Sequence, residues 1–587
     1  AENAGLVKFD FLGLKTLTVI NNTQKLVKKI EKNFDIESIS YEDQKVFDLL
    51  SSGNTVGLFQ VESAGMREAL IQMKPNHIED IIALVALYRP GPMSNIPTYN
   101  DCKHGRQTPD YLHPLLEDIL KPTYGVIIYQ EQVMQIAQKL SGFTAGQADL
   151  LRRAMGKKKR AELEKQKQGF IAGALKNGIA KDVAAGIFLK IEPFAEYGFN
   201  KSHAAAYAII SYQTAFLKTY YPKDFIAASM TMDITNQNKL SEFYEELKRL
   251  NIEITRPDIN ECFADFRTID NKFYYALGGI KAVGFEAISN VVKERTENGK
   301  FQSINDFLNR VNPKDMNKLQ LEGLVKAGAF DNINKNRQSL FDSIPNFILK
   351  TKNIFENKSV NQIDLFSEDE ASQNNIINEI EDWKFEERLS KEFEAVGFFI
   401  SDHPLNQFTE IFDDYKIIDY SKFNSSDEIK NANIAATLLK AQERKTAKGN
   451  SYAVLKLTDL TSVFELFIFS DILELNREIL KEGNSLLLTL VKSISNDENR
   501  FKRINVQKIG SMMDLFNSPI NEVSFDINSD ENLDAISKIL AEDGKTEVNI
   551  NMVVDDKTLK FKLKNTRLLE RKLLNLLRKR EISSTIN

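Results

Sequence analysis

Cysteine is scarce in this sequence, which has two in 587 residues, Cys102 and Cys262. So few thiols, so far apart, exclude a disulfide framework and a cysteine-based zinc cluster, and they fit a reducing compartment. The five histidines are scattered, without the His-x-His or His-Glu-x-x-His spacing of catalytic zinc sites. We find no apolar run that would span a bilayer and no secretory leader. The length favours a globular protein of about three to five domains.

An excess of positive charge is also lacking, because the formal net charge is −5. The charges are nevertheless segregated along the chain. Acidic residues gather in 368–387 and around 526–534, whereas 151–170 is strongly basic. The cations of this basic segment are Arg152, Arg153, Lys157, Lys158, Lys159, Arg160, Lys165 and Lys167. Because local patches decide where a phosphate backbone docks, the composition does not exclude a nucleic-acid partner.

Hydrophobic periodicity divides the chain into a helical and a strand-rich part. Alternation over Leu6–Leu12 predicts a strand, and because the chain opens inside it, we expect a fragment that continues upstream. The pattern is then mainly helical to about residue 260, with clear segments at Glu131–Leu140 and Ala204–Tyr220. The polar, acidic stretch Ser367–Asp382 is typical of a linker.

Short strands dominate the later part of the sequence. The strands expected between residues 434 and 509 are Tyr452–Leu457, Phe464–Phe469 and Ser485–Val491. Their size and spacing predict a small barrel of the OB type. A strand pair at Val548–Val554 and Leu559–Leu563 then precedes a basic helix predicted over Thr566–Arg580.

Asp10 is the candidate catalytic residue, on an otherwise apolar strand two residues after Lys8. Nucleotidyl transfer needs carboxylates at strand ends, because two Mg²⁺ ions must be held about 4 Å apart to activate a 3′-hydroxyl and stabilise the leaving pyrophosphate. On the pattern alone, a structural salt bridge is the commoner explanation of one aspartate on a strand.

Two segments offer phosphate-binding groups. Several cations of Arg152–Arg160 lie within three turns and would neutralise a triphosphate or template phosphates, with a solvated helix face as the alternative. In Tyr197–Tyr207, Asn200 or Ser202 would cap a helix whose first amides favour an anion. Lys201 and His203 would add donors there, and a simple helix cap is the alternative.

Other motifs indicate contacts with DNA and with a protein partner. Turns at 279–284 and 321–330 resemble helix-hairpin-helix modules, whose backbone amides bind DNA phosphates without reading sequence. The DNA-binding candidates are Gly279, Lys281, Gly284, Lys326 and Gly328 in these turns, and Arg444, Lys445 and Lys448 in a basic loop of the predicted barrel. Gln362–Phe366 suits an extended peptide with Leu365 and Phe366 as apolar anchors in a partner's pocket and Gln362 at the rim.

Taken together, these segments resemble bacterial replicative DNA polymerases of the polymerase III alpha (C-family) type. The resemblance is carried by Lys8–Leu14, Tyr88–Pro92, Tyr124–Gln132, Arg152–Lys159 and Tyr197–Tyr207, in the order found in that family. It covers nearly the whole chain and is weakest after residue 510.

The resemblance implies a multidomain α+β fold. The expected parts are the end of a palm (1–15), mainly helical fingers (16–265), a helix-hairpin-helix and clamp-binding region (266–366), a linker (367–425), an OB fold (426–512) and a small α/β domain that binds the clamp-loader tau subunit (513–587). Asp10 would be the third palm aspartate, with Lys8 close by, sharing two Mg²⁺ ions with upstream aspartates that this chain does not contain.

The resemblance also implies roles for the other candidates. The residues expected around the nucleotide and template are Arg89, Tyr129, Arg152, Arg153, Lys157, Lys158, Lys159, Asn200, Lys201, Ser202, His203 and Tyr207. Gln362, Asp364, Leu365 and Phe366 would bind the sliding clamp. The implied partners are primer–template DNA, deoxynucleoside triphosphates, the clamp, the tau subunit and a proofreading exonuclease subunit, in the bacterial cytoplasm.

The implied activity is template-directed transfer of nucleotides to a primer 3′-hydroxyl, and we expect the fragment alone to be inactive. The first alternative is a non-catalytic DNA- and clamp-binding module, which would have no need of Asp10. The second is an error-prone alpha-type paralogue in repair, which the clamp motif and the long tail beyond the barrel disfavour.

Overall fold

The structure is a computed structural model that describes residues 4–6, 9, 11–156, 160–359, 377–446, 449–494, 502–527, 530–554 and 557–586. It divides into two compact units, each described by itself. Unit 1 comprises residues 1–279 and 284–297, and unit 2 comprises residues 280–283 and 298–587. None of the described helices is long and apolar enough to cross a membrane.

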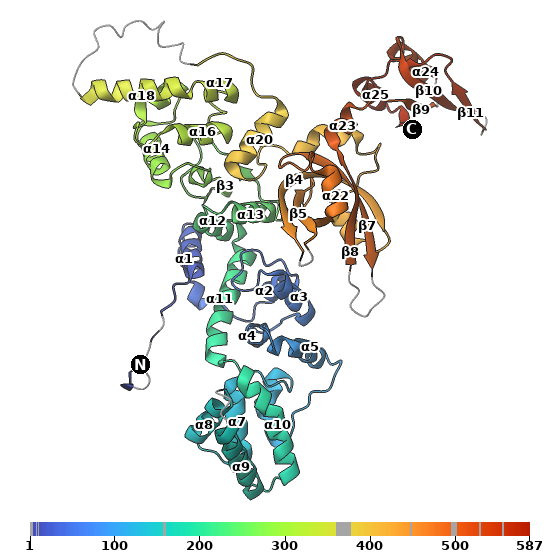
Figure 1. The fold of residues 1–587 in the computed structure, drawn as a ribbon. Coiled ribbons are helices and arrows are strands. Elements are labelled where there is room, and N and C mark those ends of the chain that lie inside the picture. Colours follow the sequence, from blue (N-terminus) through green and yellow to red (C-terminus); the bar gives the residue numbers. More distant parts are fainter. Residues whose placement is uncertain are drawn as a thin grey trace. The chain divides into compact units, whose positions relative to one another are not determined.

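Unit 1 is built mainly of helices (Figure 1). They are α1 (Lys15–Val27), α2 (Gln44–Ser51), α3 (Ala64–Met73), α4 (Ile78–Leu87), α5 (Ile96–Lys103), α6 (Glu117–Leu120), α7 (Gln130–Ser141), α8 (Ala145–Gly156), α9 (Arg160–Lys176), α10 (Lys181–Tyr197), α11 (Lys201–Tyr220), α12 (Pro222–Met232), α13 (Gln237–Arg249) and α14 (Phe285–Asn298). Three short strands, β1 (Ile254–Thr255), β2 (Arg267–Ile269) and β3 (Lys272–Tyr274), form a sheet of order β1-β3-β2.

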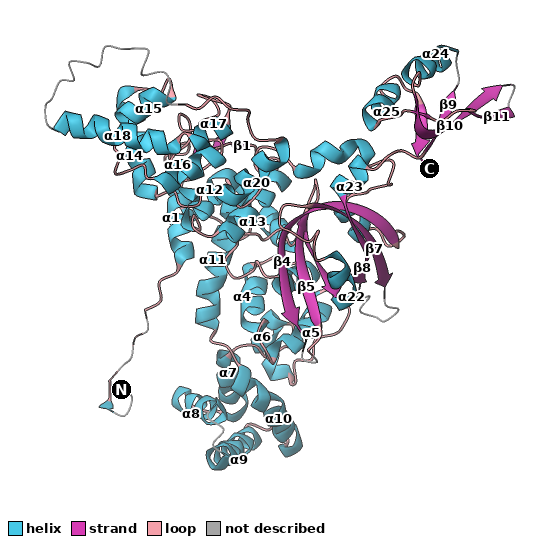
Figure 2. Cartoon of the chain, turned by 45° about the horizontal axis from the view of Figure 1, so that its top comes forward, coloured by secondary structure: helices cyan, strands magenta, loops and turns pink. Residues whose placement is uncertain are grey.

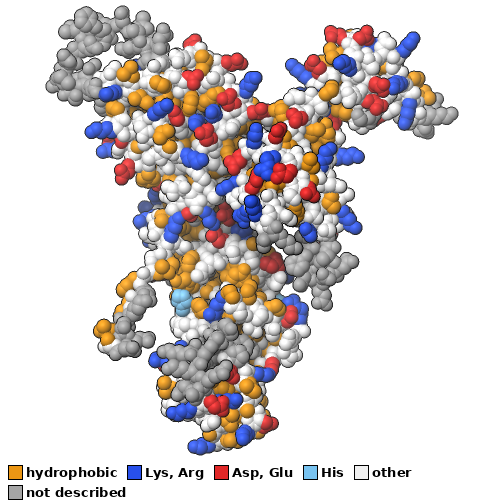
Figure 3. Space-filling model, in the orientation of Figure 1, with side chains coloured by type: hydrophobic (Ala, Val, Ile, Leu, Met, Phe, Trp, Pro, Cys, Tyr) orange, Lys and Arg blue, Asp and Glu red, His pale blue; other side chains and the backbone are white. Residues whose placement is uncertain are grey.

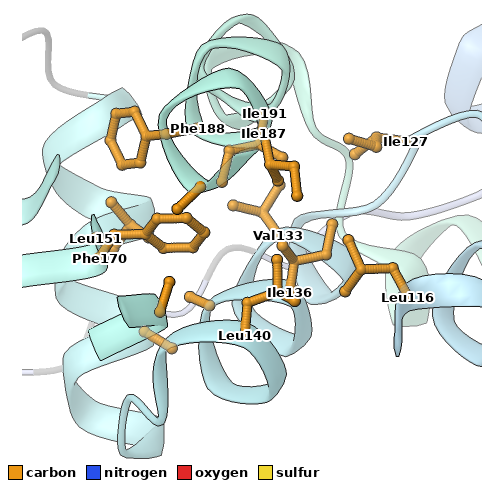
Figure 4. Packing of buried hydrophobic residues seen from close by; sticks show 14 of the residues in the cluster. Leu116, Ile127, Val133, Ile136, Leu140, Leu151, Phe170, Ile187, Phe188 and Ile191 are labelled. Atoms are coloured by element: carbon orange, nitrogen blue, oxygen red, sulfur yellow. The ribbon is translucent and has the colours of Figure 1, made fainter. Parts of the chain in front are cut away.

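Helices α7 to α10 enclose a core of their own (Figure 4). On α7, Val133, Ile136 and Leu140 recur at helical spacing and are fully buried. They meet Phe170 of α9 and Phe188 of α10, whose rings pack edge to face with centroids 5.4 Å apart. This packing fixes the first turn of α7 and the polar side of α8, which carry several of the candidate site residues.

Helix α11 is the longest described helix of unit 1, with 20 residues. Its N-cap is Asn200, whose side chain accepts a hydrogen bond from the backbone amide of His203 at 2.8 Å. The chain enters α11 through a parallel bridge between Tyr129 and Phe199. The starts of α7 and α11 therefore lie side by side, although about 70 residues separate them in the sequence.

Unit 2 combines a helical part with two sheets (Figure 1). Its helices are α15 (Ile304–Arg310), α16 (Lys318–Lys326), α17 (Arg337–Asp342), α18 (Ile344–Ser359), α20 (Phe385–Val396), α21 (Tyr420–Ser425), α22 (Ser470–Asn476), α23 (Met512–Asn517), α24 (Asp530–Ile539) and α25 (Arg571–Arg578). Buried Arg337 of α17 binds Asp331 at 2.7 Å and Glu392 of α20 at 3.3 Å, which joins the segment after residue 377 to α16 and α17.

The larger sheet has five antiparallel strands (Figure 2). They are β4 (Asn431–Lys445), β5 (Ser451–Thr458), β6 (Val463–Phe469), β7 (Ser485–Ile494) and β8 (Lys502–Ser511), in the order β6-β5-β4-β7-β8. Alternate side chains of β4, β5 and β6 enter one buried core, as the period of a strand requires. In the described residues the sheet is open, because no strand pairing joins β6 to β8.

The smaller sheet contains β9 (Glu522–Ile527), β10 (Asp543–Val554), β11 (Lys557–Lys562) and β12 (Ser583–Ile586) in the order β11-β10-β9-β12. Strands β9 and β10 are parallel, and α24 lies between them in the sequence, as a crossover connection requires. Leu574 and Leu577 of α25 are buried against this sheet.

Two expectations differ from the described structure. The predicted strand at Leu6–Leu12 is not formed by its described residues, among which Phe9 and Phe11 are 73% and 96% exposed. A strand needs a hydrogen-bonding neighbour, and the described residues offer none here. Of the predicted linker 367–425, residues 377–425 contain α20, α21 and the 3₁₀ turn Pro404–Ile411, with buried apolar side chains.

Candidate functional site

Several sequence candidates lie outside the described residues. These are Lys8 and Asp10, Lys157, Lys158 and Lys159, Lys448, and the peptide Gln362–Phe366. Among the described residues, no group of three or more His, Cys, Asp or Glu side chains is arranged to hold a metal ion. The site built below therefore consists of basic, polar and aromatic side chains.

The first turn of α11 already holds an anion, the carboxylate of Glu131. The backbone amide of Lys201 donates to both Glu131 oxygens at 3.1 Å, and the Asn200 side-chain amide donates to Oε1 at 3.0 Å. Asn200 rather than Ser202 is the cap, and Ser202 is exposed. The helix end thus favours negative charge as expected, with an internal carboxylate as its partner.

Aromatic rings run along one face of α11, beginning just before it. The ring centroids of Phe199 and His203 are 5.5 Å apart, and those of His203 and Tyr207 are 4.4 Å apart. The Arg89 guanidinium lies 4.6 Å from the centroid of Phe199, and burial lowers the pKa of Arg89. The three rings of Phe199, His203 and Tyr207, with the Arg89 guanidinium at one end, form a partly exposed surface that we call the row of rings. Bases stack on surfaces of this kind.

Tyr129 is buried, with 3% of its surface exposed, and burial raises the pKa of its hydroxyl above the usual range. The Lys201 ammonium lies 5.4 Å from its ring centroid. Gln132 fixes the turn before α7 by accepting from the amides of Ile128 and Tyr129 at 2.8 and 3.0 Å. Tyr129 is therefore placed to support Lys201 rather than to contact a ligand directly.

Arg152 and Arg153 on α8 share one carboxylate, Asp149. Arg152 Nη2 lies 2.7 Å from Asp149 Oδ1, and Arg153 Nε lies 2.8 Å from Oδ2. The hydrogen bond from Arg152 is the main reason that the pKa of Asp149 is lowered. Arg152 also reaches Gln130 Oε1 at 3.4 Å, which links α8 to the start of α7 and hence to Glu131. On the face shown in Figure 3, cations are likewise intermingled with carboxylates.

A cavity of about 600 Å³ adjoins the start of α7. Its lining includes Thr123, Tyr129, Glu131, Gln132, Lys139 and Lys201. The cavity, the hydrogen bonds and the ring contacts together place Tyr129, Arg152, Asn200, Lys201 and His203 near one another, as the family resemblance implied. Arg89 and Tyr207 join them through the row of rings.

The two glycine-containing turns differ in exposure. In the first, Lys281 is exposed, Gly279 is buried and Gly284 is half-buried at the start of α14. In the second, Lys326 binds Glu394 at 2.9 Å, and a Cβ at Gly328 would lie 2.1 Å from the Arg337 guanidinium. The first turn is thus the more accessible to a DNA phosphate.

The outer face of the five-stranded sheet carries aromatic side chains that the sequence analysis missed. Phe467 and Phe469 of β6 are 54% and 51% exposed. Phe469 of β6 lies opposite Tyr452 of β5 in the strand register, and Tyr452 lies opposite Arg444 of β4. Two aromatic residues and one basic residue are therefore neighbours across the three strands. Arg444 and Lys445 are exposed at the end of β4. The alternation in Val463–Phe469 contains this information, because every second residue must face away from the core.

Comparison with known proteins shows two matching domains. Residues 16–178 match the bacterial DNA polymerase III alpha subunit finger domain, and residues 251–340 match a helix-hairpin-helix motif. Three similar curated proteins are each named DNA polymerase III subunit alpha. The Caulobacter vibrioides protein is 42% identical over 502 residues, 85% of this chain and 44% of the relative. The Rickettsia bellii protein is 40% identical over 583 residues (92% and 49%), and the Escherichia coli protein is 38% identical over 505 residues (83% and 44%). The chain spans about half the length of the curated relatives it matches.

Proposed function

We propose that this chain, a relative of the bacterial DNA polymerase III alpha subunits, supplies the nucleotide- and DNA-binding half of a replicative DNA polymerase. The observation that carries the proposal is 38–42% identity over more than four fifths of the chain to proteins of that name. The reaction is template-directed transfer of a nucleotide to a primer 3′-hydroxyl. A divalent metal ion, Mg²⁺ in our proposal, would activate that hydroxyl with Asp10 as one ligand.

In unit 1, Arg152 and Arg153 bind the phosphates of the incoming nucleotide. Their partner Asp149 is about one third exposed, and exposed ion pairs contribute only about 0–1 kcal/mol. A triphosphate with several charges is a stronger partner for two guanidinium groups than one carboxylate is. The nucleotide thus takes the place of Asp149, and Lys201 and His203 in the first turn of α11 add donors.

The row of rings acts on bases rather than on phosphates. His203 is exposed and Tyr207 is half-buried, so the row has accessible faces and edges. Stacking of a base on an aromatic side chain contributes about 1–3 kcal/mol and tolerates any base. A replicative polymerase needs this tolerance, because it copies every sequence.

In unit 2, the sheet with Phe467 and Phe469 binds the single-stranded template. We propose an OB-type domain here, supported by the strand order with α22 between β6 and β7, and the outer aromatic residues beside Arg444 suit an unpaired strand. Lys281 and the turn around it contact duplex phosphates. We propose the sliding clamp as the partner of Gln362–Phe366, and the clamp-loader tau subunit as the partner of residues 513–587.

A fluorescence anisotropy titration with labelled primer–template DNA tests the proposal on the 587-residue chain. We expect binding that weakens with salt, with about 0.9 log units of slope for each phosphate contact. Arg444→Ala with Lys445→Ala should reduce this slope, whereas Lys562→Ala in the smaller sheet is a control that removes one exposed cation. Absence of binding at low salt would contradict the proposed function.

Catalysis is tested in a hybrid in which the unmatched half of the Caulobacter vibrioides relative is joined to this chain. Asp10→Asn should lower single-nucleotide incorporation by orders of magnitude and leave DNA affinity nearly unchanged. Incorporation within about tenfold of the unsubstituted hybrid would exclude Asp10 as a metal ligand.

A further inference from the structure

The loop between α2 and α3 is held in place by one face of α11. On this helix Tyr207 is followed at helical spacing by Ser211, Thr214 and Lys218. Thr214 Oγ1 accepts a hydrogen bond from the Phe59 amide at 3.2 Å, and Ser211 Oγ donates to the Phe59 carbonyl at 2.9 Å. Both hydroxyl groups are fully buried, so these bonds form away from competing water.

Lys218 completes the attachment of the loop. Its ammonium donates to the carbonyls of Asn54 and Val56 at 2.9 and 2.8 Å and pairs with Glu246 at 2.7 Å. An ammonium group has three donors, and all three are used. Lys218 is 3% exposed, and a buried lysine is costly unless it is paired in this way. These buried polar contacts hold an irregular loop in one position, which indicates that the position of the loop is important for function.

The loop carries Phe59 and Gln60 to the end of the row of rings. The centroid of the Phe59 ring lies 5.5 Å from that of Tyr207. Gln60 follows directly, is exposed, and has a φ of 59°. This left-handed conformation is unfavourable for a glutamine and would be relaxed in a glycine. The loop therefore holds an exposed amide side chain, at a cost in backbone strain, next to a surface suited to bases.

We propose that Gln60 contacts the edge of a nucleobase stacked on the row of rings, with Thr214 and Lys218 as positioning residues. The inference rests on the proposed function and adds a residue to its base-binding side. A neutral amide presents a donor and an acceptor, which match base edges, whereas phosphates are matched by cations. The Phe59 ring contacts Tyr207, and the buried bonds from the Phe59 backbone to α11 hold the loop that carries Gln60 beside the rings.

The test uses 2-aminopurine, whose fluorescence reports stacking and contacts of the base. Two titrations are compared. In the template arm, 2-aminopurine replaces the base at the first unpaired template position. In the nucleotide arm, it is the base of the nucleoside triphosphate. The 587-residue chain is titrated in both arms, with anisotropy of the labelled DNA as a separate measure of binding. The arm that responds identifies the base as template or incoming nucleotide.

Gln60→Gly is the main variant, because it removes the side chain and relaxes the backbone. We expect the chain to melt at or above the wild-type temperature, while the affinity in the responding arm falls about fivefold, the effect of one hydrogen bond. If Gln60 had a purely structural role, a variant that is as stable as wild type would also bind as tightly as wild type. Asn251→Gly is the matched control, because Asn251 also has a positive φ, of 54°, and is exposed.

Thr214→Val and Thr214→Ser test the positioning role. Valine has nearly the shape of threonine but lacks the hydroxyl, so we expect it to lower affinity about as much as Gln60→Gly, whereas serine should preserve binding. If the aminopurine signal of Gln60→Gly equals that of wild type, or if neither arm responds while anisotropy shows DNA binding, the inference is wrong. If anisotropy shows no binding by the wild-type chain, the proposed function itself fails.

Discussion

The carboxylate of Glu131 contacts the backbone amide of Lys201 through both of its oxygens, each at 3.1 Å. The same carboxylate accepts from Asn200, so the positive end of α11 is neutralised from within the protein. Under the proposed function, an incoming phosphate would therefore meet Lys201 and the arginines of α8 rather than the free amides of the helix. The helix end orders the site, and the side chains supply the exchangeable contacts.

Glu131→Gln should separate these two effects. The substitution removes the negative charge and one acceptor, so we expect a loss of about 1 kcal/mol in the stability of unit 1. Because no carboxylate then neutralises the N-terminus of α11, the affinity for inorganic tripolyphosphate should rise about threefold. Calorimetric titration measures this affinity, and Glu68→Gln, at an exposed position on α3, is the charge-matched control. A lower tripolyphosphate affinity than in that control would contradict the competition between Glu131 and phosphate.

Asp149→Asn should release Arg152 and Arg153. The pairs are partly exposed, so thermal stability should change by no more than about 1 kcal/mol. Two unpaired guanidinium groups should bind tripolyphosphate about tenfold more tightly. Glu297→Gln is the control, because it changes net charge equally and Glu297 pairs with Lys293 on α14 instead of an arginine. Equal affinities of the two variants would favour the solvated-face interpretation of Arg152–Arg160.

Burial of Lys218 predicts a pH dependence of stability. Burial lowers the pKa of Lys218 to about 8, from an ordinary value of 10.5, although Glu246 opposes the shift. Between these values the unfolded chain binds more protons, so this group makes unit 1 more stable as pH rises from 8 to 10.5. The Glu246 carboxylate and the Arg67 and Arg249 cations are the charged groups that act on it.

The check is thermal melting at pH 7.5 and 9.5, compared with Lys218→Met and Lys218→Arg. Methionine does not titrate and arginine stays charged, so both variants should lack the gain seen in wild type. The other titrating groups are common to the three proteins and cancel in the comparison. A wild-type difference between the two pH values no larger than in the variants would show that Lys218 is not titrating in this range.

Local patterns in the sequence predicted the secondary structure well. Glu131–Leu140 is confirmed as part of α7, and the three strands predicted between residues 434 and 509 are confirmed as β5, β6 and β7. These elements have strong periodicity and bury the expected side. The strand at Leu6–Leu12 was predicted from alternation alone, and its described residues lack the neighbour that makes a strand stable.

Site geometry depends on contacts that local patterns do not contain. Asn200 was correctly considered as a cap, but its partner Glu131 is about 70 residues away and no spacing rule connects them. Lys218 binds the carbonyls of Asn54 and Val56 in the loop that carries Gln60, although more than 150 residues separate it from that loop. Phe467 and Phe469 were accessible to prediction, because the alternation that places Phe464 inside places them outside.

The last prediction concerns these two side chains. If Phe467 and Phe469 are the stacking surface for an unpaired strand, replacing both by alanine should remove about 1–3 kcal/mol of binding for each lost base contact. Affinity for an oligothymidine should therefore fall about tenfold or more. The folded state should lose little, because about half of each side chain is exposed. Leu475→Ala on α22 is the control, because Leu475 is 82% exposed and not aromatic. Titration of the three proteins with the labelled oligonucleotide at fixed salt gives the comparison. An equal affinity of the double variant and wild type would show that β6 does not bind the single strand, and it would favour the basic end of β4 as the contact.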